Sequence, residues 1–171
     1  GIGGSGATLA CRQSLRAALA ALLGPGGDEL AFVPNTTAGV ITVAQSIAWT
    51  PGDRVVLFRG EFPANTTPWQ LVAKQHGLEL VWLDLEDFEA SDDQGLAALD
   101  AALARGVRLV AVSAVQFRSG LRMPLEAMAQ RCQARGAELF VDAIQGLGAT
   151  PLHVAMGFDY LAAGGHKWLL A

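Results

Sequence analysis

The 171-residue sequence is poor in charge, in cysteine and in long hydrophobic runs, and each shortage argues against a class of protein. Its 12 Lys and Arg are scattered and outnumbered by 16 Asp and Glu, so we expect no nucleic-acid partner. No apolar run approaches the roughly 18 residues of a membrane-spanning helix, so we expect no membrane partner. Cys11 and Cys132 lie far apart, and we predict that both are reduced and structural in a cytoplasmic protein.

Two further kinds of site are weakly supported. The three histidines, at positions 76, 153 and 166, lack metal-ligand spacing, so we expect no metal site. Residues 1–6 match the G-x-G-x-x-G fingerprint, but no predicted strand precedes them, as dinucleotide binding requires. A nucleotide-binding α/β oxidoreductase is therefore only a rival hypothesis.

What the sequence has in abundance is apolar residues, at 51%. Their spacing alternates between strand-like and helical, which predicts βαβ crossovers and a parallel sheet covered on both faces. We predict strands at 29–33, 54–58, 78–85, 107–115, 138–141 and 159–163. We predict helices at 12–23, 37–49, 67–75, 94–105 and 124–135. The predicted fold class is α/β, a three-layer sandwich with a mainly parallel sheet.

Polar and aromatic residues follow several of these strands, at the sheet edge where ligands bind. Thr36 and Thr37 open a helix, which either binds phosphate through free N–H groups or is an ordinary helix cap. Phe62 either stacks on a flat ligand ring or packs under its own loop. Asp142 ends a buried strand, where a carboxylate needs a partner. It is either a helix cap or the partner of a protonated ring nitrogen.

The last predicted strand is followed by His166 and Lys167 among apolar residues. A lysine in apolar surroundings is a nucleophile able to form a Schiff base, whereas a surface lysine keeps its amine in water. A phosphate-binding helix start, a stacking ring, a strand-end carboxylate and such a lysine together match the needs of pyridoxal phosphate.

Four stretches, NTTAGV, GEFPANTTPW, VDAIQGLGATPL and GGHKWLL, occur in an order and spacing that resemble the class V aminotransferases. This family lies within fold type I of the pyridoxal-phosphate enzymes and includes cysteine desulfurases and isopenicillin N epimerase-like proteins. The resemblance runs from about Leu15 to the end of the chain. It implies pyridoxal 5'-phosphate as cofactor, an amino-acid substrate and a homodimer.

The resemblance also implies residue roles. Lys167 would carry the internal aldimine and shuttle protons, and Asp142 would hold the pyridine nitrogen protonated. The other implied cofactor contacts are Thr36 and Thr37 to the phosphate with help from His166, Gln145 to the phenolic oxygen, and Phe62 stacked on the ring.

Several positions depart from the family pattern. Gly164 stands where many members have a phosphate-binding Ser or Thr, which implies that some phosphate contact comes from elsewhere. Phe62 stands where desulfurases place a His. Desulfurase-like members often carry His and Asn near Ala114 and Phe117.

Family members run to roughly twice this length. Residues 1–171 are therefore predicted to be a large-domain fragment without the N-terminal arm, the last strand and the small C-terminal domain, with a gap in the sheet between its first and last strands. The leading hypothesis is an aminotransferase or epimerase-like enzyme acting on an amino acid. The alternatives are a C–S lyase or cysteine desulfurase-like enzyme, and a non-catalytic fragment that binds only cofactor or partners.

Overall fold

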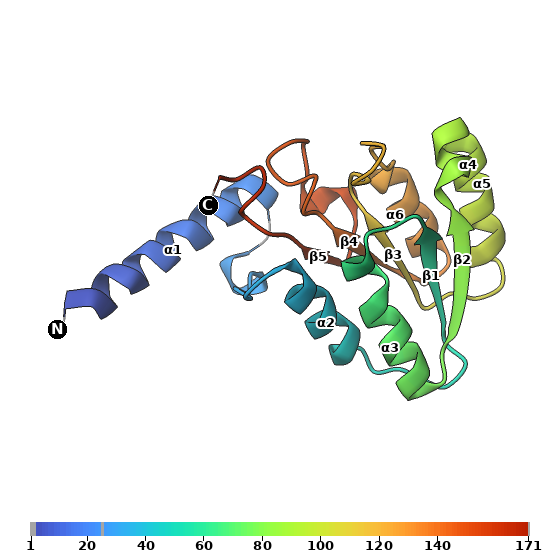
Figure 1. Ribbon diagram of the computed structural model, residues 1–171, viewed down its shortest axis with the longest axis horizontal. Coiled ribbons are helices and arrows are strands. Elements are labelled where there is room, and N and C mark those ends of the chain that lie inside the picture. Colours follow the sequence, from blue (N-terminus) through green and yellow to red (C-terminus); the bar gives the residue numbers. More distant parts are fainter. Residues whose placement is uncertain (1–2, 25, 171) are drawn as a thin grey trace.

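The computed structural model describes residues 3–24 and 26–170, and it has helices on both faces of a sheet (Figure 1). Five parallel strands lie in the order β2-β1-β3-β4-β5. The strands are β1 Arg54–Arg59, β2 Glu79–Asp84, β3 Leu109–Ser113, β4 Glu138–Asp142 and β5 Tyr160–Ala162. The α-helices are α1 Gly3–Leu23, α2 Thr36–Ser46, α3 Thr67–His76, α4 Leu85–Ala90, α5 Asp92–Leu103 and α6 Leu125–Ala134. Three short 3₁₀ helices are η1 Gly27–Glu29, η2 Pro63–Asn65 and η3 Val154–Met156.

The central strands bury both of their faces, as their unbroken apolar runs predict. Val56 and Phe58 of β1 belong to a core cluster that also contains residues of α4, α5 and α6. Val55 and Leu57, which alternate with them, belong to a second cluster formed with α2 and α3. The sheet is therefore the middle of three layers, and the predicted α/β class is confirmed.

The predicted strand at 29–33 is wrong. Glu29 ends η1, and the residues after it run beside α1 and not in the sheet. The guanidinium carbons of Arg12 and Arg16 lie 5.4 and 5.1 Å from the centroid of the Phe32 ring, and Arg16 donates a hydrogen bond to the carbonyl of Leu30. Phe32 thus packs against α1, and because this segment is not a strand of the described sheet, the predicted gap beside it does not arise.

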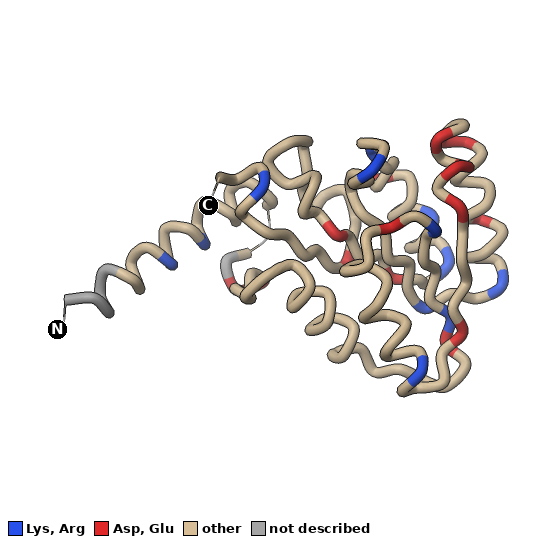
Figure 2. Tube along the Cα trace, viewed as in Figure 1, with Lys and Arg blue, Asp and Glu red and all other residues tan. Residues whose placement is uncertain are grey.

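Helix α4 is the second difference, since a strand was predicted to continue to residue 85. Strand β2 ends at Asp84, and Leu85 begins the helix. Glu86 and Asp87 lie in its first turn, where negative charge stabilises a helix. Figure 2 shows Asp and Glu gathered on α4 and at the start of α5.

The two cysteines differ in their surroundings. Cys132 lies in the core, where burial and, secondly, the charge of Asp159 raise the pKa of the thiol to about 12 and leave it unreactive. Cys11 is exposed on α1, so the prediction of a structural role holds only for Cys132. No helix in the described part of the chain is long and apolar enough to cross a membrane.

We expect the change Gly95→Ala to destabilise the fold although alanine favours helices. A Cβ on Gly95, in α5, would lie 2.2 Å from the ring of Phe88, which is 2% exposed. Overpacking of this kind costs about 1–3 kcal/mol, more than the roughly 1 kcal/mol that alanine gains in a helix. Urea unfolding should show a lower midpoint for Gly95→Ala. Adding Phe88→Leu should offset the loss, and a more stable single variant would contradict the packing.

Candidate functional site

A crevice lies between β1 and β3, where the order in which the strands are added to the sheet reverses. Strand β1 pairs with β2 on one side and with β3 on the other, and such switch points are where open α/β sheets bind ligands. A cavity of about 180 Å³ lies at the carboxyl ends of the strands. It is lined by Asn35, Thr36, Thr37, Phe62, Ala64, Ser113, Val115, Phe117, Asp142, Ile144, Gln145, His166 and Lys167.

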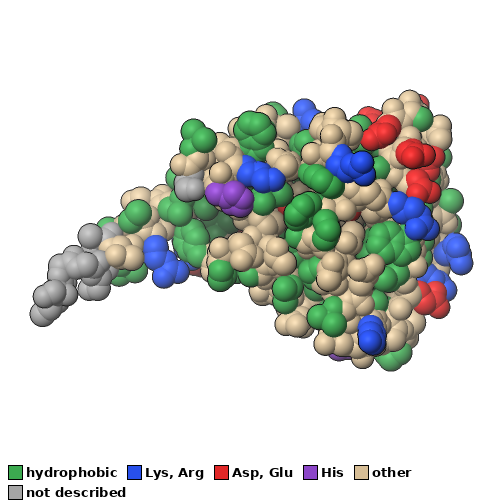
Figure 3. Space-filling model, viewed as in Figure 1, with side chains coloured by type: hydrophobic (Ala, Val, Ile, Leu, Met, Phe, Trp, Pro, Cys, Tyr) green, Lys and Arg blue, Asp and Glu red, His purple; other side chains and the backbone are tan. Residues whose placement is uncertain are grey.

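This one cavity contains all seven residues that the sequence singles out as a cofactor site. They come from the start of α2, the loop after β1, the end of β4 and the segment after β5. Figure 3 shows a histidine and a cationic side chain side by side on the surface, among hydrophobic side chains. The individual roles of the seven residues stay predictions.

One end of the cavity is the first turn of α2. Asn35 caps this helix by accepting a hydrogen bond from the N–H of Ala38 at 2.9 Å. Thr36, which is 3% exposed, has a buried hydroxyl with no hydrogen-bond partner among the described residues. An unpaired buried hydroxyl is costly, and here it adds a donor to the free amides of a helix start. This end is suited to an anion such as phosphate.

The same end explains why a glycine occupies position 164. A Cβ placed there would lie 3.0 Å from the Thr36 hydroxyl oxygen and 3.1 Å from two atoms of the His166 ring. The threonine hydroxyl and the imidazole therefore fill the space that a serine or threonine side chain at position 164 would need. The sequence predicts that phosphate contacts come from elsewhere, and these two groups are the nearest candidates.

A buried carboxylate also lines the cavity. Asp142, at the end of β4, is 2% exposed. Burial raises the pKa of its carboxyl to about 6, and the negative charge of Glu61 adds to this shift. The Ile144 N–H, which donates to Oδ1 at 3.0 Å, and the positive charge of Lys167 lower the pKa and so oppose the shift. A carboxylate in this position would gain from a cationic hydrogen-bond donor in the cavity, such as a protonated ring nitrogen.

Two aromatic side chains form a further part of the cavity lining, an aromatic wall. Phe62 and Phe117 pack edge to face, with ring centroids 5.3 Å apart and an interplanar angle of 77°. Both rings are partly exposed, at 49% and 42%, although they lie in contact with each other. Phe62 therefore does not pack beneath its own loop, the alternative interpretation of this residue. The pair presents an apolar surface to a ligand in the cavity.

Lys167 differs from the sequence prediction in one respect, because it is exposed and not buried among apolar residues. It follows β5, the strand at one edge of the described sheet, and Trp168 beside it is 54% exposed. Trp168 Nε1 donates to Gln145 Oε1 at 3.3 Å, so the Gln145 amide nitrogen is the group available to donate to a ligand.

The sequence analysis missed two residues beneath the cavity. Ser113, the last residue of β3, lines it, and the buried Glu61 accepts hydrogen bonds from Ser113. Both follow or end strands, and Glu61 lies within the stretch GEFPANTTPW, so its place beside Phe62 was the available signal.

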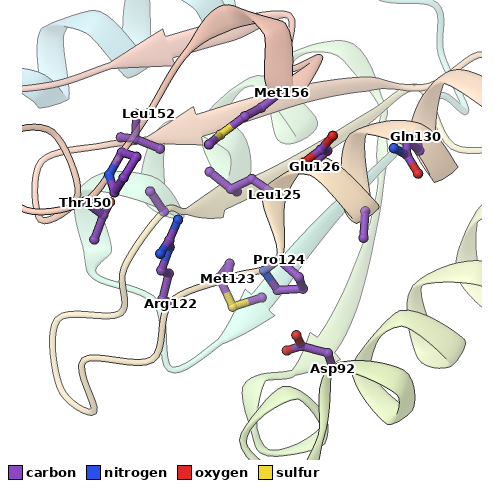
Figure 4. A pocket seen from close by; sticks show the side chains of 13 residues that line it. Asp92, Arg122, Met123, Pro124, Leu125, Glu126, Gln130, Thr150, Leu152 and Met156 are labelled. Atoms are coloured by element: carbon purple, nitrogen blue, oxygen red, sulfur yellow. The ribbon is translucent and has the colours of Figure 1, made fainter. Parts of the chain in front are cut away.

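A larger cavity of about 570 Å³ lies between the start of α6 and the segment after β4 (Figure 4). Arg122, Met123 and Leu125 face Leu152 and Met156 there, and none of the predicted site residues lines it. No group of three or more His, Cys, Asp or Glu in the described part of the chain could hold a metal ion.

Comparison with known proteins identifies the family. The family model "Aminotransferase class-V" matches residues 5–171, so the chain belongs to the class V aminotransferase family, a family of pyridoxal-phosphate enzymes. The chain is 33% identical over 157 residues to isopenicillin N epimerase of Streptomyces clavuligerus, covering 91% of this chain and 39% of that protein. It is also 33% identical over 144 residues to a cysteine desulfurase of Pectobacterium atrosepticum, covering 82% of this chain and 35% of that protein.

Solved structures agree with this membership. A mutant of C-DES with glycine covalently linked to its PLP cofactor superposes with a TM-score of 0.85 at 26% identity, covering 96% of this chain and 45% of that one. The fold is that of the fold type I pyridoxal-phosphate enzymes. The chain thus spans less than half the length of the relatives that it matches.

The residues present fit pyridoxal phosphate on structural grounds. The unpartnered Thr36 hydroxyl at a helix start suits its phosphate, and the buried Asp142 carboxyl suits its ring nitrogen. The aromatic wall of Phe62 and Phe117 suits the flat face of the cofactor ring.

We expect Asp142→Asn to stabilise the cofactor-free protein at neutral pH. The folded-state pKa of about 6 lies above the roughly 3.9 of an unfolded chain, so the stability that Asp142 contributes at acid pH is lost as pH rises through 6. Two pKa units correspond to about 2–3 kcal/mol. Asparagine can still accept from the Ile144 N–H.

Urea unfolding of the two proteins at pH 4 and pH 8 measures this difference. The free energy of unfolding should rise by about 2 kcal/mol in Asp142→Asn at pH 8 and change little at pH 4. Asp28→Asn, at an exposed aspartate, should show no such contrast between the two pH values. A loss of stability at pH 8 in Asp142→Asn would mean that the buried carboxylate is satisfied without a ligand.

Proposed function

We propose that this protein uses pyridoxal phosphate to act on an amino acid by transamination or epimerisation. The observation that carries the proposal is the gathering of an anion-binding helix start, an aromatic wall, a buried carboxylate and the His166–Lys167 pair in one cavity. The family membership and the names of the relatives support the class of chemistry.

The proposed work of each side chain follows from its place. Thr36 and the first amides of α2 would hold the phosphate, and Lys167 would bind the cofactor covalently through its amine. Bound there, pyridoxal phosphate would supply an electron sink for the bonds at the amino acid's α-carbon. The Asp142 carboxylate would hold a proton at the ring nitrogen. The exposed Lys167 amine, at the mouth of the cavity, would take and return the α-proton.

The wall of Phe62 and Phe117 favours transamination or epimerisation over C–S cleavage. Neither ring can move a proton, whereas an imidazole at position 62 could. The second candidate is nevertheless a C–S lyase, because relatives include a cysteine desulfurase, and the structural neighbour C-DES is a cystine C–S lyase. The products distinguish the two: a keto acid or an inverted amino acid for the first, and persulfide or sulfide for the second.

Borohydride reduction tests the covalent role of Lys167. The chain has only two lysines, Lys74 and Lys167, and Lys74 lies in the last turn of α3. After incubation with pyridoxal phosphate and reduction, peptide mapping should find the label on Lys167. Lys74→Ala should keep the label and Lys167→Ala should lose it. Labelling of Lys74 alone, or of neither lysine, would refute the proposal.

The proposed proton-transfer role of Lys167 can be measured separately from its covalent role. Exchange of the α-proton in D₂O, followed by NMR over a panel of amino acids, reports a step common to transamination and epimerisation. We expect Lys167→Ala to slow this exchange by about 10²–10⁴-fold, the usual contribution of general acid–base catalysis. Exchange at the wild-type rate would remove Lys167 from the mechanism.

Thr36→Val tests the phosphate end of the cavity, because it should stabilise the cofactor-free protein and weaken the binding of pyridoxal phosphate. Removing an unpaired buried hydroxyl should raise the free energy of unfolding of the cofactor-free protein by about 1 kcal/mol. The same change should weaken pyridoxal phosphate binding by about tenfold, the typical value of a hydrogen bond to a charged group. Binding of pyridoxal, which lacks the phosphate, should not change.

The control is Thr42→Val, at an exposed threonine of the same helix whose hydroxyl donates to the Ala38 carbonyl. It should alter neither ligand's affinity. Equal weakening of pyridoxal and pyridoxal phosphate by Thr36→Val would mean that the hydroxyl does not face the phosphate.

A further inference from the structure

A second buried carboxylate lies next to the cavity without lining it. Glu61 follows β1 and is 8% exposed. Gly60 before it has a φ of +93°, a left-handed conformation that glycine adopts without strain and that turns the chain at the end of the strand. Burying a carboxylate is costly, so Glu61 needs a compensating arrangement of donors.

Glu61 has such donors from β3 and from the segment after it. The backbone N–H of Ser113 donates to Oε1 at 2.6 Å, the Ser113 hydroxyl donates to Oε2, and the Gln116 amide nitrogen donates to Oε1 at 3.0 Å. Both carboxylate oxygens thus accept hydrogen bonds, as suits an ionised carboxyl. The charge is held in a fixed place.

That place is set by the divergence of two strands. β1 and β3 are in register at Val55–Leu109 and Val56–Val110. Three residues further along β3, the Ser113 N–H meets the Glu61 carboxylate and not a backbone carbonyl of β1. Glu61 therefore joins the end of β1 to the end of β3 next to the cavity.

The bridge brings Glu61 close to Asp142. Ser113 is the register partner of Asp142 in β4, and the N–H of Ala114 donates to the Asp142 carbonyl at 2.8 Å. The charged side chains that act on Asp142 are Glu61, from the loop after β1, and Lys167, from the segment after β5. The negative charge of Glu61 disfavours a second negative charge at Asp142, and Lys167 has the opposite effect.

We propose that Glu61 is a positioning residue whose fixed negative charge makes the Asp142 position hold a proton more tightly. In the cofactor-free protein that proton lies on the Asp142 carboxyl. With pyridoxal phosphate bound, it lies on the ring nitrogen beside an ionised Asp142, and Glu61 keeps it there to higher pH. The second statement rests on the proposed function, whereas the first does not.

Glu61→Gln tests the charge while keeping the shape, since glutamine can still accept from the Ser113 N–H and donate to its hydroxyl. Carbon-13 NMR of the carboxyl groups in the cofactor-free protein gives the Asp142 midpoint, with the resonance assigned by its loss in Asp142→Asn. We expect Glu61→Gln to lower this midpoint by roughly half to one pH unit. The nitrogen-15 shift of labelled pyridoxal phosphate should give a parallel decrease for the ring nitrogen.

Two further variants separate charge from structure. Ser113→Ala removes a hydrogen bond to Glu61 but no charge, so the Asp142 midpoint should stay near its wild-type value. Glu89→Gln removes a carboxylate from the exposed surface of α4 and should leave both midpoints unchanged. Equal decreases in Ser113→Ala and Glu61→Gln would mean that Glu61 acts only by supporting the structure, and would overturn the proposal.

Other outcomes are equally decisive. An unchanged Asp142 midpoint in Glu61→Gln overturns the proposal. If that variant does not fold, the wild-type spectra still decide, because the Glu61 resonance must shift as Asp142 titrates, and an independent Glu61 resonance overturns the proposal. A wild-type protein that fails to bind pyridoxal phosphate refutes the proposed function, and the cofactor-free titration still tests the action of Glu61 on Asp142.

Discussion

The divergence of β1 and β3 at their carboxyl ends, bridged by the Glu61 carboxylate, is the constraint on which the site depends. A parallel sheet brings its strand ends to one edge, but adjacent strands in full register would leave no space there for a ligand. Here the hydrogen bond that Ser113 would give to a neighbouring strand goes to Glu61 instead. Ser113, at this bridge, lines the cavity, and so does Asp142 in the next strand.

The cavity concentrates features that do not favour folding in the absence of a ligand. Asp142 carries a carboxyl whose charge burial disfavours, and Thr36 carries a hydroxyl without a hydrogen-bond partner in the described structure. Phe62 and Phe117 leave much of their rings exposed. A ligand with an anionic group, a flat ring and a protonated nitrogen would satisfy all of these at once. The residues themselves thus suit this cofactor, independently of the comparison with relatives.

Much of the fold was predictable because the buried strands carry their own signal. The predicted strands at 54–58, 107–115 and 138–141 overlap β1, β3 and β4 and are rich in Val, Leu and Phe, with turn residues between them and the next helix. Residues 29–33 have a similar apolar pattern, yet they pack on α1. None of these residues is buried, so their apolar pattern alone did not distinguish a strand of the sheet from a segment that runs beside a helix.

The sequence predicted which residues line the cavity better than it predicted how they are arranged. Asp142 and Lys167 could be named because one ends a predicted strand and the other follows one, and Thr36 could be named because it opens a predicted helix. Glu61 lies beside Phe62 in the sequence, but its contact with β3 could not be predicted, because Ser113 is 52 residues away along the chain. The exposure of Lys167 also depends on which elements cover β5, and local sequence does not contain that information.

The resemblance implies that the difference from desulfurase-like relatives lies on the aromatic wall, at Phe62, whereas the residues proposed to bind the cofactor line other parts of the cavity. An anion-binding helix start and a buried carboxylate prepare the same cofactor for any reaction at the α-carbon. Phe62 and Phe117 would instead face the ring of a bound cofactor, where two phenylalanines provide neither a proton donor nor a hydrogen-bond acceptor. Proton transfer on that side of the site must then depend on Lys167. A reaction that needs only one base at the α-carbon is therefore better matched to this wall than one that also protonates a leaving sulfur.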